Sequence, residues 1–229
     1  MPVDMELEAV LRPLQYAMPP YPSKTITLAN GKVMVVRQAA RADVPAILKS
    51  VHPCLFIERD YYDIVSARLY GELLAWYRYR VKSEYCLLGQ VDGYLVGIVN
   101  GRMENEQVGM SYHTLAIDRG LRIGSHLFAA KMEYHMDYLG QESVLIVAES
   151  PIGFRRWMIE YPLEKTNIPH ELGGGDSYRL TREIYLAAKP RLVVGDRPVP
   201  QALLDEAVAE IKFADDDTIR ERIAGLKGR

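Results

Sequence analysis

Apolar and polar residues follow two different periods on either side of a glycine turn near the middle of the chain. Residues 113–117 are mostly apolar and partly β-branched, which indicates a buried strand. From Arg122, apolar residues recur at intervals of three or four as far as Tyr138, which is the stripe of an amphipathic helix. Asp118 and Gly120 are turn-forming residues between the two. The sequence therefore predicts a strand that leads into a long helix through a very short turn.

The same patterns predict strands and helices over most of the chain. β-rich runs predict strands at residues 25–28, 32–37, 84–91, 94–100, 107–117, 144–148 and 178–186. Apolar spacing predicts helices at residues 41–48, 61–80, 122–138 and 154–159. Asn30-Gly31 and Asp92-Gly93 are strong hairpin-turn signals, so the strands that flank each of them are expected to pair antiparallel. The predicted fold class is α/β, with strands and helices mixed along the chain.

The pattern divides the chain into three parts. Residues 1–32 are an N-terminal arm with a short predicted helix at residues 6–11 and a proline-rich loop after it. Residues 33–188 hold the strands and helices of one domain. Residues 189–229 form a C-terminal extension with two predicted helices, the first of which has an apolar stripe. That stripe is expected to pack on its own domain or, alternatively, to join two copies in a homodimer.

Composition narrows the class of protein. The 229 residues are 48% hydrophobic and 25% charged, the make-up of an ordinary globular chain. A formal net charge of -2 and an isoelectric point near 6.2 argue against a general nucleic-acid or anionic-membrane binder. No apolar run reaches membrane-spanning length, and the first residues lack the order of a signal peptide. We therefore expect a cytoplasmic protein with no nucleic-acid and no membrane partner.

The cysteines and histidines do not suggest metal or redox chemistry. Cys54 and Cys86 lie far apart, each beside apolar residues, and are expected to be buried free thiols. His126 and His135 lie nine residues apart on one predicted helix, a spacing that does not place both on one face. We therefore expect no metal site.

The strand, turn and helix near the middle of the chain are suited to bind an anion. The first N–H groups of a helix have no partner within the helix, and the helix dipole adds partial positive charge there. Gly120 and Gly124 have no Cβ, so a phosphate can approach the main chain closely. Arg119 and Arg122 add cationic donors beside them. A glycine turn between strand and helix is also common in α/β proteins that bind nothing there, so the rest of the chain must be considered.

A short motif in this segment resembles that of a known family. Residues 119–125 read Arg-Gly-Leu-Arg-Ile-Gly-Ser, which is similar to the cofactor-binding motif of the GNAT N-acetyltransferases: Arg or Gln, two residues, Gly, one residue, then Gly or Ala. Arg122 stands where the first glycine of the motif is expected. The order of predicted elements from residue 33 to residue 186 is also similar to that family. The resemblance implies a mixed, mostly antiparallel central sheet flanked by helices.

The resemblance also implies a cofactor, acetyl-CoA or another acyl-CoA. In GNAT proteins the turn binds the pyrophosphate, and here it consists of Arg119, Gly120, Leu121, Arg122, Ile123, Gly124 and Ser125. The thioester carbonyl is met in that family by main chain at the end of the preceding strand, which here is Leu115, Ala116 and Ile117. Residues 21–48 resemble the start of the acetyltransferase domain in bacterial protein-lysine acyltransferases, which implies a protein lysine as acceptor.

Acyl transfer to an amine calls for a base, and many GNAT enzymes place a glutamate on that strand. Residues 109–113 of this chain contain no carboxylate, so His113 is the first candidate, because an imidazole titrates near neutral pH. A buried histidine that only bonds a neighbour is an equal alternative. Glu106, and also Glu84 and Glu104, are further candidates for the base, although each fits a solvated charge as well.

The acid that protonates the leaving thiolate is a tyrosine in many family members. Met158 stands at the matching place here, so Tyr161, three residues along, is the candidate. The aromatic helix at residues 61–80 is expected to line the acceptor pocket or simply to pack on the sheet.

Three functions fit these observations. The first is an acyl-CoA-dependent N-acyltransferase that moves an acetyl or other short acyl group to a primary amine, on a protein lysine or a small molecule. The second is a non-catalytic acyl-CoA sensor or regulatory protein on the same fold, favoured by Arg122, Met158 and the missing strand glutamate. The third is an interaction domain in which Arg122 closes the cofactor groove.

Overall fold

A computed structural model describes residues 16–81, 83–170, 172 and 175–224, and its centre is one eight-stranded sheet. The helix predicted at residues 6–11 lies outside the described residues. The strands are β1 (Lys24–Thr27), β2 (Val33–Gln38), β3 (Glu84–Val91), β4 (Tyr94–Met103), β5 (Val108–Ala116), β6 (Ser143–Val147), β7 (Glu164–Thr166) and β8 (Ser177–Thr181). Their spatial order is β1-β2-β3-β4-β5-β6-β8-β7. Neighbouring strands pair antiparallel, except that β5 and β6 are parallel.

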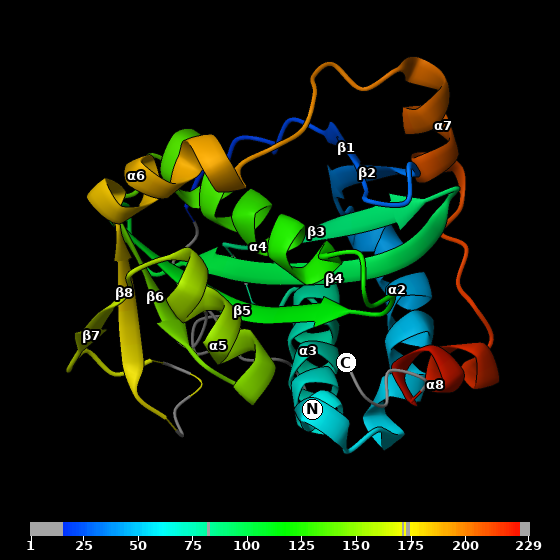
Figure 1. The fold of residues 1–229 in the computed structure, drawn as a ribbon, viewed down its shortest axis with the longest axis horizontal. Coiled ribbons are helices and arrows are strands. Elements are labelled where there is room, and N and C mark those ends of the chain that lie inside the picture. The colour runs from blue at the N-terminus through cyan, green and yellow to red at the C-terminus, as the bar shows by residue number, and fades with distance from the viewer. Residues whose placement is uncertain (1–15, 82, 171, 173–174, 225–229) are drawn as a thin grey trace, which may run out of the picture.

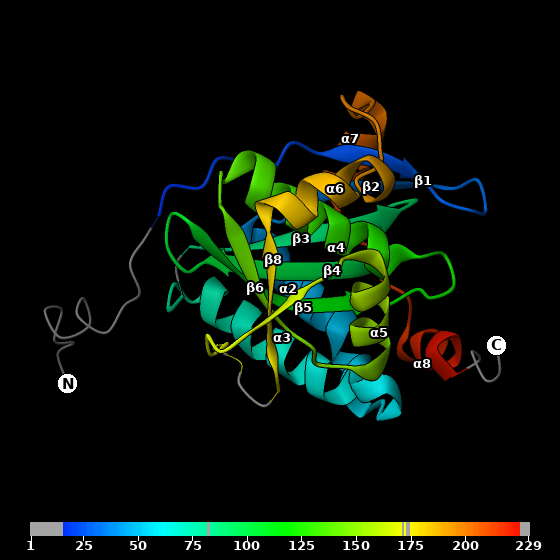
Figure 2. The same cartoon turned by 60° about the vertical axis from the view of Figure 1, so that its left-hand side comes forward.

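Helices cover both faces of this sheet (Figures 1 and 2). The helices are α2 (Val44–Val51), α3 (Tyr62–Tyr77), α4 (Ile123–Glu133), α5 (Pro151–Glu160), α6 (Arg182–Leu192), α7 (Gln201–Ala209) and α8 (Asp216–Ala224), and α4 continues into a π-helical turn, η4 (Tyr134–Tyr138). Short 3-10 turns η1 (Arg41–Asp43), η2 (His52–Phe56) and η3 (Arg59–Tyr61) lead into or out of α2 and α3. On one face lie α4, α5 and α6, and on the other lie α2 and α3.

Each face of the sheet has its own hydrophobic core. Successive side chains of a strand point to opposite faces, and β3 is buried on both of them. Leu87 joins the core under α4, whereas Leu88 joins the core under α2 and α3. A third cluster holds α5 and α6 against α4, where Phe128 stacks on Trp157 with ring centroids 4.8 Å apart. The sheet is therefore a buried middle layer.

Turn chemistry and strand pairing agree with the sequence at both predicted hairpins. The pairing of β1 with β2 and of β3 with β4 confirms them. Asp92 and Gly93 both have positive φ, 52° and 76°, as a two-residue hairpin turn of this type requires. Cys54 and Cys86 are buried free thiols, as predicted. No helix within the described residues is both long enough and apolar enough to cross a bilayer.

The prediction of one strand over residues 178–186 is wrong beyond Thr181. The Thr181 hydroxyl accepts a hydrogen bond from the N–H of Ile184 and caps α6, which begins at Arg182. Tyr185, Ala188 and Leu192 are then buried at helical spacing. The short edge strand β7 was not predicted, because its residues are mostly exposed and show no alternation of apolar and polar side chains.

The C-terminal extension packs on its own domain. Ile211, Ile219 and Ile223 are buried in the core formed with α2 and α3. The carbonyl of Ala207 in α7 accepts a hydrogen bond of 3.0 Å from Nε of Arg37 in β2. The alternative of a homodimer through this extension stays a prediction.

We expect the substitution Ile223→Ala to lower the free energy of unfolding by about 2–5 kcal/mol, because the side chain is fully buried and its loss leaves a cavity. Urea unfolding at equilibrium measures this change. Val208→Ala in α7 is the control, since Val208 is 57% exposed, and its effect should stay within about 0.5 kcal/mol. Equal effects of the two substitutions would mean that α8 adds nothing to the core.

Candidate active site

The two parallel strands of the sheet separate at one end. Pairing joins Val108–Ser111 of β5 to Ser143–Ile146 of β6 and stops there. Beyond Ser111, β5 continues to Ala116 while still paired with β4, and β6 ends at Val147. The carboxyl ends of parallel strands lie at the same edge of a sheet, so both following helices, α4 and α5, start beside this gap.

A cavity of about 480 Å³ lies at this gap. Its walls come from the end of β5, the start of α4, the residues after β6, the first turns of α5, and the start of α3. They include Asp60, Tyr62, Val65, Thr114, Leu115, Ala116, Asp118, Arg119, Gly120, Arg122, Ile123, Gly124, Ser125, Glu149, Ser150, Ile152, Gly153, Arg155, Arg156, Trp157 and Ile159. A cavity between diverging strands and two helix N-termini is a typical place for a ligand in an α/β protein.

The α4 wall of the cavity is the predicted anion site. α4 begins at Ile123 and has no side-chain cap, so its first N–H groups are not satisfied by a capping residue. Gly120 has a φ of 91°, a conformation that favours glycine. Arg122 has a φ of 60°, so the backbone adopts a glycine-like conformation where the family motif has a glycine. The turn therefore has positive φ at both Gly120 and Arg122, with an arginine where the family motif has a glycine.

The Arg122 side chain does not close the cavity. It is 56% exposed, and its Nη2 lies 3.0 Å from Oε1 of Glu160 at the end of α5. The same carboxylate accepts from the Ser125 hydroxyl at 3.1 Å and pairs with Arg156 at 2.7 Å. Glu160 thus anchors two arginines and a serine of the wall. Arg155 lines the cavity as well, and within the described chain it has no carboxylate partner.

The start of α3 contacts the end of β5 across the cavity. The Tyr62 hydroxyl donates to the carbonyl of Ala116 at 2.7 Å. Arg119 lies over the Tyr62 ring, 5.5 Å from its centroid, and pairs with Asp60 at 2.8 Å. Asp60 and Tyr61 both have positive φ, 54° and 59°, which is unusual for residues other than glycine. These contacts fix the turn after β5 against α3.

At the floor of the gap, His113 pairs with a carboxylate that sequence reasoning did not identify. Nδ1 of His113 lies 2.7 Å from Oε2 of Glu149, the second residue after β6. The other oxygen of Glu149 accepts from Arg68 of α3 at 3.0 Å. His113 is fully buried, and its Nε2 has no partner among the described residues. Glu149 itself lines the cavity.

The contacts of Glu149 decide its charge. Burial alone would raise the pKa of this carboxyl, but the hydrogen bond from His113 and the charge of Arg68 outweigh burial and hold the pKa below its ordinary value. Glu149 is therefore an anion at neutral pH. Because an anionic carboxylate only accepts, Nδ1 of His113 carries the hydrogen of this bond. A carboxylate and an imidazole joined in this way exchange protons as a pair.

Most of the predicted cofactor-binding residues line the cavity. Leu115, Ala116, Arg119, Gly120, Arg122, Ile123, Gly124 and Ser125 are part of its wall. Ile117 and Leu121 are not: Ile117 is buried in the core under α2 and α3, and Leu121 packs on the core under α4.

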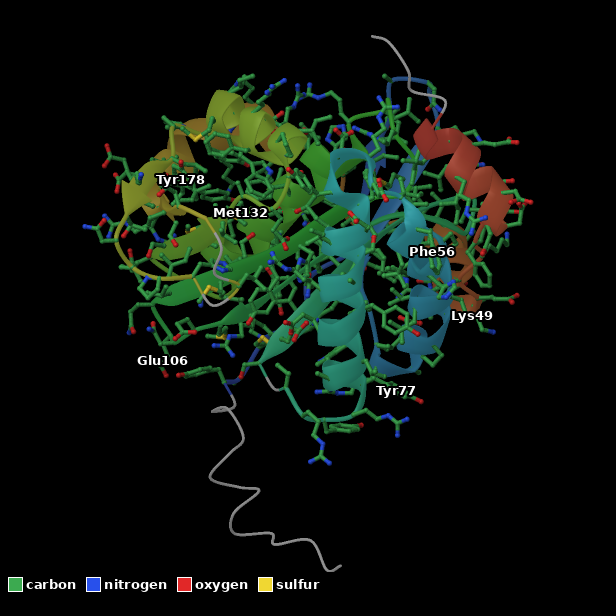
Figure 3. All side chains as sticks on the ribbon, turned by 90° about the horizontal axis from the view of Figure 1, so that it is seen from below. Lys49, Phe56, Tyr77, Glu106, Met132 and Tyr178 are labelled. Carbon is green, nitrogen blue, oxygen red and sulfur yellow. The ribbon has the colours of Figure 1, made fainter. Side chains whose placement is uncertain are left out.

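Two of the predicted catalytic residues lie away from the cavity. Glu106 is exposed in the loop before β5, at the opposite end of that strand, and Figure 3 labels it at the edge of the molecule. Tyr161 follows the end of α5 with extended backbone and is buried against Phe128, with ring centroids 5.7 Å apart. Burial raises the pKa of its hydroxyl well above the ordinary value. Neither side chain contacts the space that a substrate in the cavity would occupy, whereas His113 lies beside it through Glu149.

Comparisons with known proteins agree with this geometry at the level of the fold. No family model matches the sequence, and a search of curated proteins finds no significant match. The structure is similar to an uncharacterised protein from Bacillus halodurans, with a TM-score of 0.53 and 9% identity over 74% of this chain and 95% of that one. It is also similar to a protein from T. thermophilus provisionally described as an acetyltransferase, with a TM-score of 0.50 and 14% identity over 78% and 97% of the two chains.

A further structure provisionally described as that of an acetyltransferase gives a TM-score of 0.50 and 14% identity over 78% of this chain and 94% of the other. At such identities the likeness concerns the fold. The chain shares with these structures a mixed, mostly antiparallel sheet flanked by helices, which is the GNAT-like fold class predicted from the sequence.

Proposed function

We propose that this chain is an acyl-CoA-dependent N-acyltransferase that moves an acetyl or other short acyl group to a primary amine. The observation that carries the proposal is that Glu149, paired with His113, lines the same cavity as the uncapped start of α4. The start of α4 suits an anionic nucleotide, and the Glu149–His113 pair suits an amine that must lose a proton.

The α4 side of the cavity fits the phosphates of acyl-CoA. Its donors are the first main-chain N–H groups of α4 and the side chain of Arg122, and Arg155 and Arg156 of α5 line the same cavity. Such charge-assisted hydrogen bonds contribute about 1.5–3 kcal/mol each. When bound, acyl-CoA supplies an acyl group activated as a thioester. The main chain at Leu115 and Ala116 lines the same cavity and is the proposed contact for the thioester end.

The acceptor side of the cavity carries acidic residues. Asp60, Asp118 and Glu149 line the cavity, and each is ion-paired with an arginine, Arg119, Arg222 and Arg68 respectively. The proposal for a cationic amine therefore depends on Glu149, which also contacts His113. A lysine-type amine must be neutral to react, and at pH 7 its deprotonation costs about 4.6 kcal/mol. Glu149 is proposed to accept this proton during the transfer and to release it to solvent afterwards, because its lowered pKa keeps it ionised at neutral pH. Arg68 keeps Glu149 in place from the α3 side.

A turnover assay tests the proposal. Purified protein is mixed with acetyl-CoA and a panel of amines that includes lysine-containing peptides and small primary amines, and the release of free thiol is followed. We expect release that depends on the amine and an acetylated amine as product. The peptide arm tests whether a protein lysine is the acceptor, as the resemblance over residues 21–48 implies. Binding of acetyl-CoA without turnover on any amine would favour the non-catalytic sensor instead.

The substitution Gly124→Leu is expected to weaken acetyl-CoA binding at least about 10-fold without loss of stability. A Cβ at Gly124 would make only ordinary contacts, 3.7 Å from Cβ of Ala116 and 3.8 Å from Cγ2 of Thr114, and both of these residues line the cavity, so we expect the rest of the leucine side chain to occupy cavity space. Isothermal titration calorimetry measures the affinity. Gly71→Leu in α3 is the control, because that position has open space and brings the same gain in helix propensity. Unchanged affinity in Gly124→Leu would place the phosphates elsewhere.

A further inference from the structure

A lysine is fully buried beneath the active-site strand. Lys131, on α4, has no exposed surface, and a buried amine is costly unless oxygen atoms surround it. Its Nζ lies 3.0 Å from the carbonyl oxygen of His113 and 3.4 Å from those of Asn100 and Tyr112. The hydroxyl of Thr114 is 3.3 Å away. One side chain of α4 thus binds carbonyl groups of both β4 and β5.

These carbonyl groups belong to a bulge between β4 and β5. Val99 is opposite Thr114 and Gly101 is opposite Ser111, so Asn100 alone faces two residues, Tyr112 and His113. A bulge of this kind leaves backbone groups without their regular ladder partners. Lys131 supplies a donor for them on the α4 side of the sheet.

The bulge determines which side of the sheet His113 faces. Before it, a Cβ on Gly109 would point at His135 of η4, so odd-numbered residues face the α4 side. Strict alternation would turn His113 to that side as well. After the bulge, Thr114 contacts Lys131, whereas the ring of His113 lies on the other side, stacked on Tyr112 with centroids 6.0 Å apart. Only this arrangement brings His113 to Glu149.

A second buried side chain holds the bulge at its main-chain N–H. Oδ1 of Asn100 accepts a hydrogen bond of 3.0 Å from the N–H of His113. The Asn100 amide nitrogen donates to Glu84 at 3.0 Å, which fixes the orientation of the amide. Lys131 and Asn100 therefore bind the carbonyl and the N–H of the same residue.

We infer that Lys131 and Asn100 are positioning residues that hold the bulge of β5 and thereby turn His113 toward Glu149. Neither touches a substrate in the cavity, so their effect on acyl transfer passes through the His113–Glu149 pair. The inference rests on the proposed function for its kinetic consequence. The position of His113 can be measured without turnover.

The test uses the full chain with the substitutions Lys131→Met and Asn100→Ala, and with Met132→Ala as control. Met132 is the next residue on α4 and is also fully buried, but it packs in the cluster under α5 and α6, away from the bulge. Proton NMR follows the Nδ1–H signal of His113, assigned by its loss in His113→Gln, and steady-state kinetics give kcat and the KM for acetyl-CoA.

We expect Lys131→Met and Asn100→Ala each to lose or shift the Nδ1–H signal and to lower kcat at least about 10-fold, with the KM for acetyl-CoA nearly unchanged. Met132→Ala should keep the signal and kcat. A folded Lys131→Met or Asn100→Ala protein that keeps both overturns the inference, and if Lys131→Met does not fold, Asn100→Ala decides. If the wild type shows no turnover, the NMR signal alone decides the inference, and the missing turnover counts only against the proposed function.

Discussion

Replacing Glu149 by glutamine is expected to lower kcat at least about 100-fold and to leave the KM for acetyl-CoA nearly unchanged. Glutamine keeps the size of the side chain but cannot accept a proton from the amine. It also removes the negative charge that Nδ1 of His113 and the guanidinium of Arg68 contact at 2.7 and 3.0 Å. Because the hydrogen bonds of Glu149 are to His113 and Arg68 and not to the donors at the start of α4, acyl-CoA binding should persist.

Steady-state kinetics over a range of pH measure this effect. Glu164→Gln is the matched control, since Glu164 is an exposed carboxylate of β7 paired with Arg179, and its replacement should not change kcat. His113→Gln should also lower kcat, by a smaller factor, because Glu149 stays in the cavity. A wild-type kcat in Glu149→Gln would show that the Glu149–His113 pair takes no part in acyl transfer.

The second expected result concerns the free energy of unfolding and pH. Burial lowers the pKa of Lys131 from 10.5 to about 7, against the opposing effect of the Glu149 carboxylate. Between pH 7 and 10.5 the unfolded chain therefore binds a proton that the folded chain has released, so stability rises with pH in this window. This gain in the free energy of unfolding is complete above pH 10.5, and it is lost as the pH falls toward 7.

The size of this effect follows from the pKa difference. Each pH unit in this window changes the free energy of unfolding by about 1.4 kcal/mol. The contribution of Lys131 to that free energy therefore changes by about 4 kcal/mol between pH 7 and pH 10. Urea unfolding of wild type and Lys131→Met at several pH values measures it, because the titrations of groups that the substitution leaves in place cancel in the difference. The stability of the wild type relative to Lys131→Met should rise along this range. A difference that does not vary with pH would mean that Lys131 keeps its proton in the folded state.

Local features of the fold could be predicted from the sequence because the residues that determine them are neighbours in the chain. Asn30-Gly31 and Asp92-Gly93 specify their hairpins by turn chemistry alone. The wall at the start of α4 was predicted for the same reason, since Gly120, Arg122 and Gly124 lie within one turn. Tyr161 was placed on the helical face of Met158, but α5 ends at Glu160 and the backbone becomes extended, which turns Tyr161 into the core.

The contact between His113 and Glu149 could not be predicted from the hydrophobic periodicity of the sequence. His113 lies on β5 and Glu149 in the segment after β6, and their contact depends on the separation of β5 from β6 and on the bulge at Asn100. One signal was available: Glu149 closely follows a buried strand and precedes Ser150, the cap of α5. A carboxylate at that edge of a parallel pair is a natural candidate for a ligand or a catalytic group.

Titration calorimetry with acetyl-CoA and with S-acetylpantetheine, which lacks the nucleotide and its diphosphate, tests most directly whether the start of α4 binds phosphates. We expect acetyl-CoA to bind at least about 100-fold more tightly, a difference of about 2.7 kcal/mol, because the N–H groups of α4 and the arginines beside them contact only the larger compound. Equal affinities, or no heat and no thermal shift with either compound, would contradict a phosphate site there and remove the basis for both transferase and sensor.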